Sequence, residues 1–172
     1  LWAMSRPVHG TLAETYLRSR GITDLRNCGA LRFHPHCYYR GDEADPADRV
    51  REAWPALIAS VRDGSGELTG VSRTWLALDG SDKAPVSTPR RAKGHLLGHG
   101  IRFGVADTVM AAGEGVETML SLRQVVHDLP MVAATSANHL AALELPATLR
   151  RLYIAREDDR AGRGAADALG AR

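Results

Sequence analysis

The spacing of apolar residues predicts two kinds of secondary structure in the first half of this chain. Residues 11–20 place their large apolar side chains on one helical face, and Thr11 is suited to cap the N-terminus of that helix. The runs 57–61 and 69–76 have the apolar and β-branched composition of strands. Between them, the sequence Asp-Gly-Ser-Gly at 63–66 is a strong turn signal. The N-terminal part is therefore expected to contain a helix and a β-hairpin.

Beyond residue 103, short apolar runs alternate with helical stretches, which is typical of a parallel sheet with crossover helices. The predicted strands span 109–112, 131–134 and 152–155, and the predicted helices span 116–126, 138–145 and 161–169. The fold class predicted from this pattern is α/β, with an α+β subdomain ahead of the parallel sheet. We expect the boundary to separate residues 1–104 from residues 105–172.

Composition limits the class of protein. The chain has 172 residues, of which 44% are hydrophobic, and this suits one or two compact domains and excludes a disordered or fibrous polypeptide. Its two cysteines are too few for a disulfide scaffold, and no apolar run approaches the roughly 18 residues of a membrane span. We therefore expect a cytoplasmic protein. Because the sequence starts without Met and ends within a predicted helix, we expect it to be a fragment of a longer polypeptide.

Acidic residues gather directly after two of the predicted strands. Glu114 and Glu117 follow the first strand of the α/β part, and Glu157, Asp158 and Asp159 follow the third. Carboxylates at the carboxyl ends of neighbouring parallel strands can converge, and such a cluster of negative charge is costly unless a divalent cation neutralises it. Magnesium bound in this way usually completes its coordination on phosphate oxygens. The pattern therefore predicts a magnesium site that acts on nucleotides or nucleic acid.

Basic residues are concentrated ahead of these acids, although the formal net charge of the whole chain is only +2. The segment 73–102 carries six basic side chains against two acidic ones, for a local net charge of +4. Such a cluster suits a surface that holds phosphates. The alternative is a solvated basic loop without a dedicated ligand. The six basic residues are Arg73, Lys83, Arg90, Arg91, Lys93 and Arg102.

Several segments, taken in order, resemble the Toprim-type DNA primases of bacteria, phages and plasmids, including primase–helicases. Residues 110–115 resemble the family's apolar strand ending in Glu-Gly, and residues 157–162 resemble its Asp-x-Asp-Arg-Ala-Gly segment. Upstream, residues 13–22 are similar to the first helix of the primase core, residues 62–70 with Arg73 to its first hairpin, and residues 83–94 to its basic loop.

This resemblance implies a Toprim-type parallel-sheet subdomain preceded by an α+β primase-like subdomain. It implies that Glu114, Glu157 and Asp159 are catalytic and bind Mg²⁺ or Mn²⁺, with Glu117 as a further candidate ligand. The implied reaction is the synthesis of short RNA primers by nucleotidyl transfer. The implied partners are a single-stranded DNA template, nucleoside triphosphates and a helicase domain in the same longer chain, such as a primase–helicase of a mobile element.

The same resemblance implies a task for the basic residues. Arg73, Lys83 and Lys93 are expected to contact the nucleotide or the template backbone. Arg90 and Arg91 are expected to contribute less specifically to nucleic-acid binding, and Arg102 is a further candidate residue for it.

The sequence departs from the family pattern at the acids. The first acid of the Asp-x-Asp pair is Glu157, whose extra methylene would move a bound cation by on the order of 1.5 Å. The family usually has an acid four residues after the strand-end Glu, whereas this chain has Thr118 there and Glu117 one position earlier. Residues three and four apart share a helix face, so Glu117 is a candidate substitute. Asp158 is expected to point away from the metal.

Other functions and other roles stay open on this sequence. The acids could instead cap helices, because carboxylates near a helix N-terminus gain about 0.3–1 kcal/mol from the helix dipole. A Toprim nuclease or topoisomerase-like enzyme would use the same acids for phosphodiester chemistry, although topoisomerase chemistry needs a nucleophilic tyrosine on another domain. A third alternative is a catalytically silent nucleic-acid-binding module, which Glu157 and Thr118 make credible.

Four further features argue against other functional sites. The spacing of Cys28, His34, His36 and Cys37 does not match a paired Cys-x-x-Cys zinc site. No Gly-Lys-Ser/Thr motif of a phosphate-binding loop is present. Trp54 and Trp75 are expected in the core rather than stacked on bases, and Ser136 is expected to cap the following helix rather than to act as a nucleophile.

Overall fold

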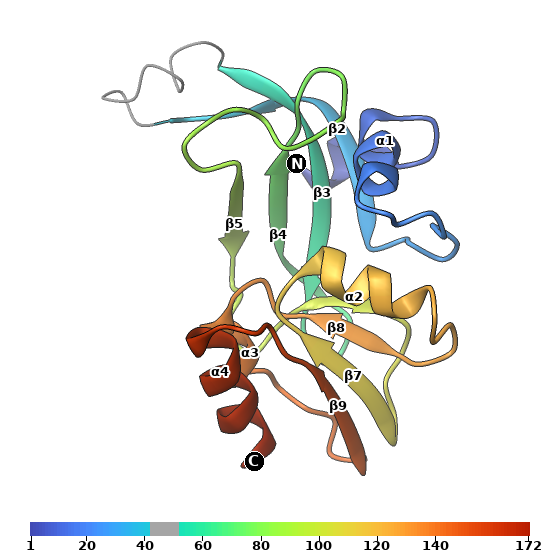
Figure 1. The fold of residues 1–172 in the computed structure, drawn as a ribbon, viewed down its shortest axis with the longest axis vertical. Coiled ribbons are helices and arrows are strands. Elements are labelled where there is room, and N and C mark those ends of the chain that lie inside the picture. The colour runs from blue at the N-terminus through green and yellow to red at the C-terminus, as the bar shows by residue number, and fades with distance from the viewer. Residues whose placement is uncertain (42–51) are drawn as a thin grey trace. The chain divides into compact units, whose positions relative to one another are not determined.

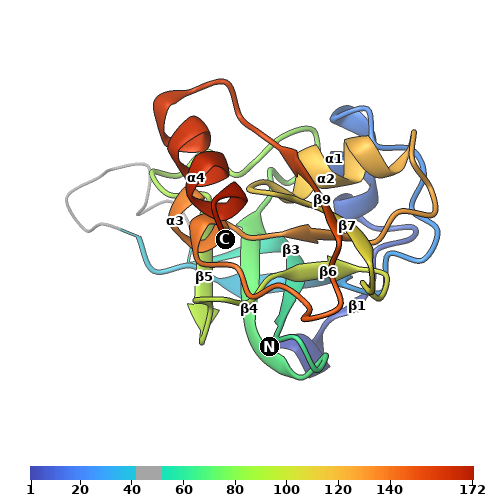
Figure 2. The same ribbon diagram turned by 90° about the horizontal axis from the view of Figure 1, so that it is seen from below.

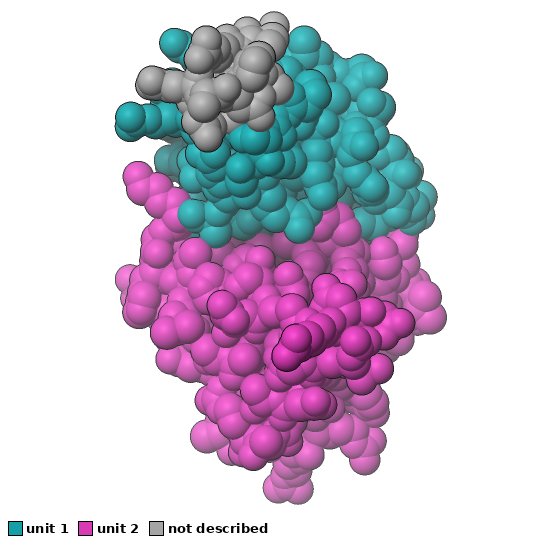
Figure 3. All heavy atoms as spheres, turned by 60° about the vertical axis from the view of Figure 1, so that its left-hand side comes forward, with its two compact units in different colours: residues 1–59, 71–92 teal, residues 60–70, 93–172 magenta. Residues whose placement is uncertain are grey.

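A computed structural model describes residues 1–41 and 52–172 (Figure 1). The chain divides into two compact units (Figure 3). Unit 1 comprises residues 1–59 and 71–92, and unit 2 comprises residues 60–70 and 93–172. None of the described helices is long and apolar enough to cross a membrane.

The first part of the chain forms a five-stranded sheet in the order β1-β2-β3-β4-β5, with β1 antiparallel to β2 and β2 antiparallel to β3. Part of this sheet belongs to unit 2: the end of β3 from residue 60, the start of β4 up to residue 70, and the end of β5 from residue 93. The elements are η1 (Trp2–Met4), β1 (Arg6–Pro7), α1 (Leu12–Ser19), β2 (Leu31–Tyr38), β3 (Ala53–Arg62), β4 (Leu68–Trp75) and β5 (Arg90–Gly94).

Helix α1 begins and ends where the sequence predicts. The hydroxyl of Thr11 accepts a hydrogen bond from the backbone N–H of Ala13 at 3.2 Å, which satisfies one of the free donors at the helix start. After the helix, Gly21 has a φ of 76°, a conformation that other residues adopt only with strain. Tyr16 and Leu17 are buried, as the apolar face predicts.

The predicted β-hairpin is formed by β3 and β4. At its turn, one carboxylate oxygen of Asp63 accepts hydrogen bonds from the backbone N–H groups of Ser65 and Glu67, both at 2.9 Å. Strand β3 begins at Ala53, four residues before the predicted start. Residues 54–61 are all buried, so this stretch lacks the alternation of a half-exposed strand and its start is hard to detect from the sequence.

Unit 2 contains a mixed four-stranded sheet in the order β6-β8-β7-β9 (Figure 2). Strand β7 runs parallel to both β8 and β9, as predicted, whereas β6 pairs antiparallel with β8. Strand β6 has only three residues, which is too short to give a periodic signal. The elements are β6 (Ile101–Phe103), β7 (Val109–Gly113), α2 (Val116–Arg123), β8 (Met131–Ala133), α3 (Ala137–Ala141), β9 (Arg151–Ala155) and α4 (Arg160–Gly170).

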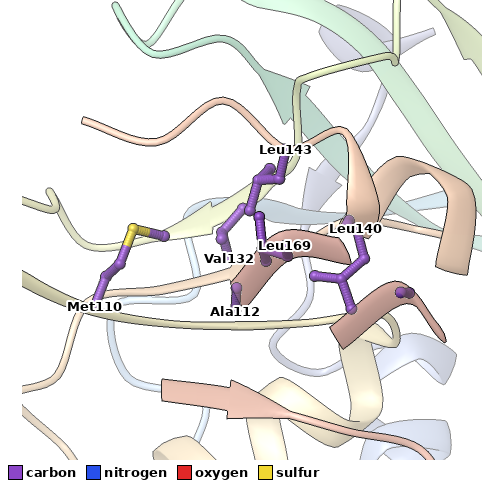
Figure 4. Close-up of a cluster of buried hydrophobic side chains, with 8 residues drawn as sticks. Met110, Ala112, Val132, Leu140, Leu143 and Leu169 are labelled. Carbon is purple, nitrogen blue, oxygen red and sulfur yellow. The ribbon is translucent and has the colours of Figure 1, made fainter. Parts of the chain in front are cut away.

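Helices pack on both faces of this sheet. Successive side chains of a strand point to opposite faces, so β7 has residues that contact helices on each side. Met110 and Ala112 of β7 pack with Leu140, from α3, and Leu169, from α4, in one buried cluster (Figure 4). A Cβ atom added to Gly113, which points to the other face, would lie 2.5 Å from the sulfur of Met119 on α2. The core of unit 2 therefore has two layers, one on each side of the sheet.

Helices α2 and α3 are shorter than the sequence predicts. Helix α2 ends at Arg123 rather than at residue 126, and the chain beyond it forms a tighter turn in which the N–H of Val125 bonds to the carbonyl of Leu122. Helix α3 ends at Ala141 rather than at residue 145, because the N–H of Glu144 donates to the carbonyl of Gly98 at 2.9 Å. Tertiary hydrogen bonding outweighs helical periodicity at that end.

Candidate functional site

Two of the acidic segments lie at the carboxyl ends of adjacent parallel strands. Strands β7 and β9 are paired, with Gly113 opposite Ala155 (Figure 1). Glu114 follows β7 directly, and Glu157 stands two residues beyond the end of β9. The topology therefore brings the two segments to the same edge of the sheet, as the sequence predicts.

The carboxylate of Glu157 reaches from β9 towards the start of α2. Its Oε1 atom accepts a hydrogen bond of 2.8 Å from the hydroxyl of Thr118. A Cβ atom added to Gly115, the residue after Glu114, would lie 3.9 Å from the same oxygen. The longer side chain of Glu157 is thus held beside the turn that contains Glu114.

Asp159 forms the N-cap of α4. Its Oδ1 atom accepts a hydrogen bond of 2.6 Å from the backbone N–H of Gly162. A Cβ atom at Gly162 would lie 2.7 Å from the carbonyl oxygen of Glu157, so glycine allows the first turn of α4 to approach this loop. Helix capping therefore accounts for one oxygen of Asp159, and its role as a metal ligand stays a prediction.

The two remaining acids differ in their surroundings. The side chain of Asp158 is 93% exposed and forms an ion pair of 3.0 Å with Arg163 of α4. This contact with Arg163 is consistent with the expectation that Asp158 does not point toward the metal. Glu117 is half-buried in the first turn of α2, and its role as a substitute ligand stays a prediction.

The donors that surround this edge are carboxylate and hydroxyl oxygens, the ligand type that Mg²⁺ and Mn²⁺ prefer. Within residues 1–41 and 52–172, no three Asp, Glu, His or Cys side chains are gathered closely enough to hold a metal ion. The donor chemistry therefore fits the predicted ion, while the joint ligation by Glu114, Glu157 and Asp159 remains a prediction.

Sequence reasoning missed the part that threonines play at this edge. Thr118 was a departure from the family pattern, and its position in the first turn of the helix that follows Glu114 was the available signal. Thr135, just after β8, has a φ of 74°, and its N–H donates to the carbonyl of Glu114 at 2.9 Å. Its hydroxyl shares a hydrogen bond of 3.0 Å with Nδ1 of His139. No sequence signal pointed to this pair.

Unit 1 holds four of the six predicted basic residues, and two of them lie on a shared pair of aromatic rings. Tyr39 and Trp75 meet edge to face with centroids 4.9 Å apart. The guanidinium of Arg73 stands 4.9 Å from the Trp75 ring, and that of Arg91 stands 5.1 Å from the Tyr39 ring. The Nε atom of Arg73 is buried and has no hydrogen-bond partner in the described structure. The structure therefore brings Arg73 and Arg91 together.

Lys83 and Arg90 complete the basic set of unit 1. Lys83 is half-buried after a turn, and its backbone N–H donates to Asp82. Arg90 starts β5, and its Nε donates to the hydroxyl of Thr74 at 3.4 Å. The expectation of a basic loop is wrong for residues 90–94, because they pair with β4 as a strand. Contact with nucleotide or template stays a prediction for both residues.

Unit 2 contains Lys93 and Arg102 together with the acids. Lys93 is exposed on β5. Arg102 is half-buried on β6, and burial lowers the pKa of its guanidinium, against smaller opposing effects of Asp63 and Glu144. Its Nη2 atom is buried and has no hydrogen-bond partner in the described structure.

Several residues singled out in the sequence are structural. Trp54 and Trp75 are 5% and 1% exposed, which confirms that they are core residues. Ser136 caps α3 by accepting a hydrogen bond from the N–H of His139, as predicted. Cys28 and Cys37 are buried free thiols, and burial raises the pKa of Cys37.

Two protein-family models match this chain. Residues 1–103 match a domain of unknown function (DUF7146), and residues 109–172 match a Toprim domain. A comparison with curated proteins finds no match.

Solved structures with a similar fold are primase catalytic cores. The DnaG primase catalytic domain bound to ssDNA is 18% identical, with a TM-score of 0.56, and the match covers 95% of this chain and 61% of that one. A DNA primase domain from Pseudomonas aeruginosa is 16% identical, with a TM-score of 0.56 and coverage of 97% and 62%. The primase fragment of the bacteriophage T7 primase-helicase protein is 15% identical, with a TM-score of 0.51 and coverage of 67% and 48%. The chain thus spans about half to three fifths of the length of these structures.

Proposed function

Because this chain belongs to the DUF7146 family and continues into a Toprim domain with the fold of a primase core, we propose that it is the catalytic core of a metal-dependent primase. The proposed reaction is nucleotidyl transfer on a single-stranded DNA template. The observation that carries it is the placement of Glu157 beside the Glu114 turn, at the carboxyl edge of the Toprim sheet.

The proposed chemistry places the 3′-hydroxyl of a growing primer against the α-phosphorus of a nucleoside triphosphate. The new bond joins the 3′-oxygen to that phosphorus, the bond to the bridging oxygen breaks, pyrophosphate leaves and the hydroxyl proton passes to solvent. A bound Mg²⁺ or Mn²⁺ supplies charge neutralisation at the phosphates and activation of the hydroxyl.

In this proposal, different residues bind the metal ion and the phosphates. Glu114 and Glu157 would hold the ion, together with the oxygen of Asp159 that does not cap α4. Thr118 fixes the orientation of the Glu157 carboxylate through its hydrogen bond. Arg73, Lys83 and Lys93 are proposed to hold phosphates of the nucleotide or template, with Arg90, Arg91 and Arg102 adding positive charge.

The proposal also includes the binding partners of this chain. Among the similar structures, one is a primase domain bound to ssDNA and another is a fragment of a primase-helicase protein. We therefore extend to this chain a single-stranded DNA template, nucleoside triphosphates and a helicase domain in the same longer polypeptide.

The test uses the full-length protein with single-stranded template, ribonucleotides and Mg²⁺ or Mn²⁺. Wild type should make short primers, and Glu114→Gln should reduce their yield at least about 100-fold, because it removes a carboxylate from the proposed metal site. Asp158→Asn is the matched control, since that side chain is exposed and paired with Arg163.

Three results would contradict the proposal. Cleavage of the template without primers would indicate a nuclease or topoisomerase-like enzyme, and binding without turnover in both metals would indicate a silent nucleic-acid-binding module. Equal loss of activity in Glu114→Gln and Asp158→Asn would show that the acids at this edge have no distinct roles.

A further inference from the structure

A cavity of about 460 Å³ lies within unit 2, away from the acidic edge. It is lined by the hairpin turn at Gly64 and Gly66, by the segment 104–106 that follows β6, by the segment 144–146, and by the side chains of Arg62 and Arg102. This volume falls in the range of sites for small ligands, about 300–1,000 Å³.

The hairpin tip is fastened to the sheet, so the cavity has defined walls. Arg62 and Gly100 exchange both backbone hydrogen bonds, at 2.9 and 3.1 Å. The side chain of Arg62 also closes the turn, because its Nη1 donates to the carbonyl of Gly66 at 2.6 Å.

The guanidinium of Arg102 makes few hydrogen bonds within the described part of the protein. Arg102 donates through Nε to the carbonyl of Arg62 at 3.4 Å, but its Nη2 is buried without a partner in the described residues. No carboxylate of the described residues lies within 4.0 Å of either guanidinium.

Nearby acids are engaged elsewhere. The Oδ1 atom of Asp63 accepts three hydrogen bonds from Ser65 and Glu67 within the turn. Glu144 lines the cavity, but its carboxylate lies against Gly98, where an added Cβ would be 2.9 Å from Oε1. Arg62 and Arg102 therefore line the cavity, and Glu144 is the one acidic residue among the described residues of its lining.

Strand direction and strand order separate this cavity from the proposed reaction site. Strand β6 is antiparallel to β8, so residues 104–106 follow β6 at the end of the sheet where β7 begins. Glu114 stands at the other end of β7. Phe103 and Ala111 both pair with Met131, which places Gly104 about four residues, or roughly 13 Å along the strands, from the level of Glu114. Arg62 pairs with Gly100, near the level of Glu114, and is separated from it across the sheet, because β6 lies two strands from β7.

We propose that this cavity is a phosphate-binding subsite, separate from the acidic edge, in which Arg62 and Arg102 hold a phosphate group. Guanidinium groups bind phosphate through paired, charge-assisted hydrogen bonds. The phosphate belongs to the backbone of single-stranded nucleic acid or to a free nucleotide. The assignment of a template strand rests on the proposed function, whereas phosphate binding does not.

The experiment measures binding in EDTA, so that no metal and no turnover contribute. The full-length protein is titrated into a labelled single-stranded oligonucleotide at several salt concentrations, with fluorescence anisotropy as the readout. Arg62→Gln and Arg102→Gln should each weaken binding several-fold and reduce the slope of log K against log salt by about 0.7, the value for one lost phosphate contact on a single strand. Arg150→Gln, an exposed charge of unit 2 outside the cavity lining, is the control and should keep the slope.

A second arm identifies the source of the phosphate. ATP binding is measured by calorimetry with the same variants. Loss of strand binding supports a backbone phosphate, and loss of ATP binding alone supports a free nucleotide. Unchanged binding of both in Arg62→Gln and Arg102→Gln would overturn the subsite.

Folding controls keep the result interpretable. Thermal unfolding is measured for every variant, and Arg102→Lys, which keeps the charge, should restore part of the binding. If Arg102→Gln does not fold, Arg62→Gln alone decides between the outcomes. Glu114→Gln should abolish primer synthesis and leave binding in EDTA intact, so failure of the subsite and failure of the proposed function are distinguishable.

Discussion

At the scale of single residues, Thr118 and Glu157 are the most informative pair. Each departs from the pattern of Toprim-type primases, and the two side chains meet in one hydrogen bond of 2.8 Å. A shorter acid at position 157 would not reach as far, and an acid at position 118 would repel the Glu157 carboxylate. The two departures are therefore physically consistent with each other.

Removing the hydroxyl of Thr118 should weaken metal binding. Thr118→Val keeps the shape of the side chain but leaves Glu157 without its donor, and groups that orient metal ligands are worth about 10–100-fold in affinity. The measurement is Mn²⁺ affinity by electron paramagnetic resonance. Thr118→Ser, which keeps the hydroxyl, should bind as wild type does, and equal affinity of the Val and Ser variants would contradict this role.

Asp159 combines a structural contact with a predicted metal contact, and two substitutions separate them. Asp159→Asn keeps a good N-cap for α4 but removes the charge, so its stability should be close to that of wild type while its Mn²⁺ affinity falls. Asp159→Ala loses the cap as well and should lower the free energy of unfolding by about 1 kcal/mol. Thermal unfolding and Mn²⁺ titration of both variants test this, and unchanged Mn²⁺ affinity in both would leave Asp159 as a cap alone.

At the scale of elements, the β3–β4 hairpin depends on the carboxylate of Asp63. Hydrogen bonds from the side chain of Ser65 and the backbone of Glu67 lower the pKa of Asp63. Because this pKa is lower in the folded protein, the contribution to stability is present above the unfolded pKa and is lost as pH falls through the folded value.

Asp63→Asn should therefore loosen the turn at neutral pH. The readout is the hydrogen exchange of the Glu67 amide, which donates to Asp63 in the wild type. Exchange should be faster in the variant at pH 7, and the difference should shrink as pH falls through the lowered pKa of Asp63, because the wild-type carboxyl in the folded protein is protonated only below that pKa. Asp107→Asn, at an exposed position, is the control, and a difference that persists at low pH would argue against a charge effect.

At the scale of the whole molecule, two buried cores support two compact units. The family models meet between residues 103 and 109, whereas the compact units assign the hairpin tip at 60–70 to unit 2. The bridge between Arg62 and Gly100 explains that assignment. The boundary predicted at residues 104 and 105 stays a prediction.

The core of unit 2 can be weakened selectively. Leu169 is 1% exposed and packs against β7, β8 and α3, so Leu169→Ala should lower the free energy of unfolding by about 2–5 kcal/mol. All three tryptophans belong to unit 1, so circular dichroism should shift more than tryptophan fluorescence in a denaturant titration. Leu97→Ala, at a side chain that is 59% exposed, should change neither signal by more than about 0.5 kcal/mol. Equal effects of the two substitutions would mean that the cluster of Figure 4 does not stabilise unit 2.

The sequence by itself determined helix α1, the β3–β4 hairpin, and the alternating strands and helices from β7 to α4. Helix caps, the hairpin turn and the alternation of strands and helices depend on residues close in the chain, and Thr11, Asp63 and the strand before Glu114 therefore gave local signals. It also determined which acids follow adjacent strands, because parallel strands present their carboxyl ends together.

Only the tertiary structure decided how side chains distant in sequence meet. The contact between Thr118 and Glu157 joins residues 39 positions apart, and Arg62 and Arg102 are 40 positions apart. Local periodicity carries no information on such pairs, because they depend on how the strands pair and how close two backbones approach. Another long-range contact, between Glu144 and Gly98, ended α3 early, and Arg102 lies half-buried on a strand too short to predict.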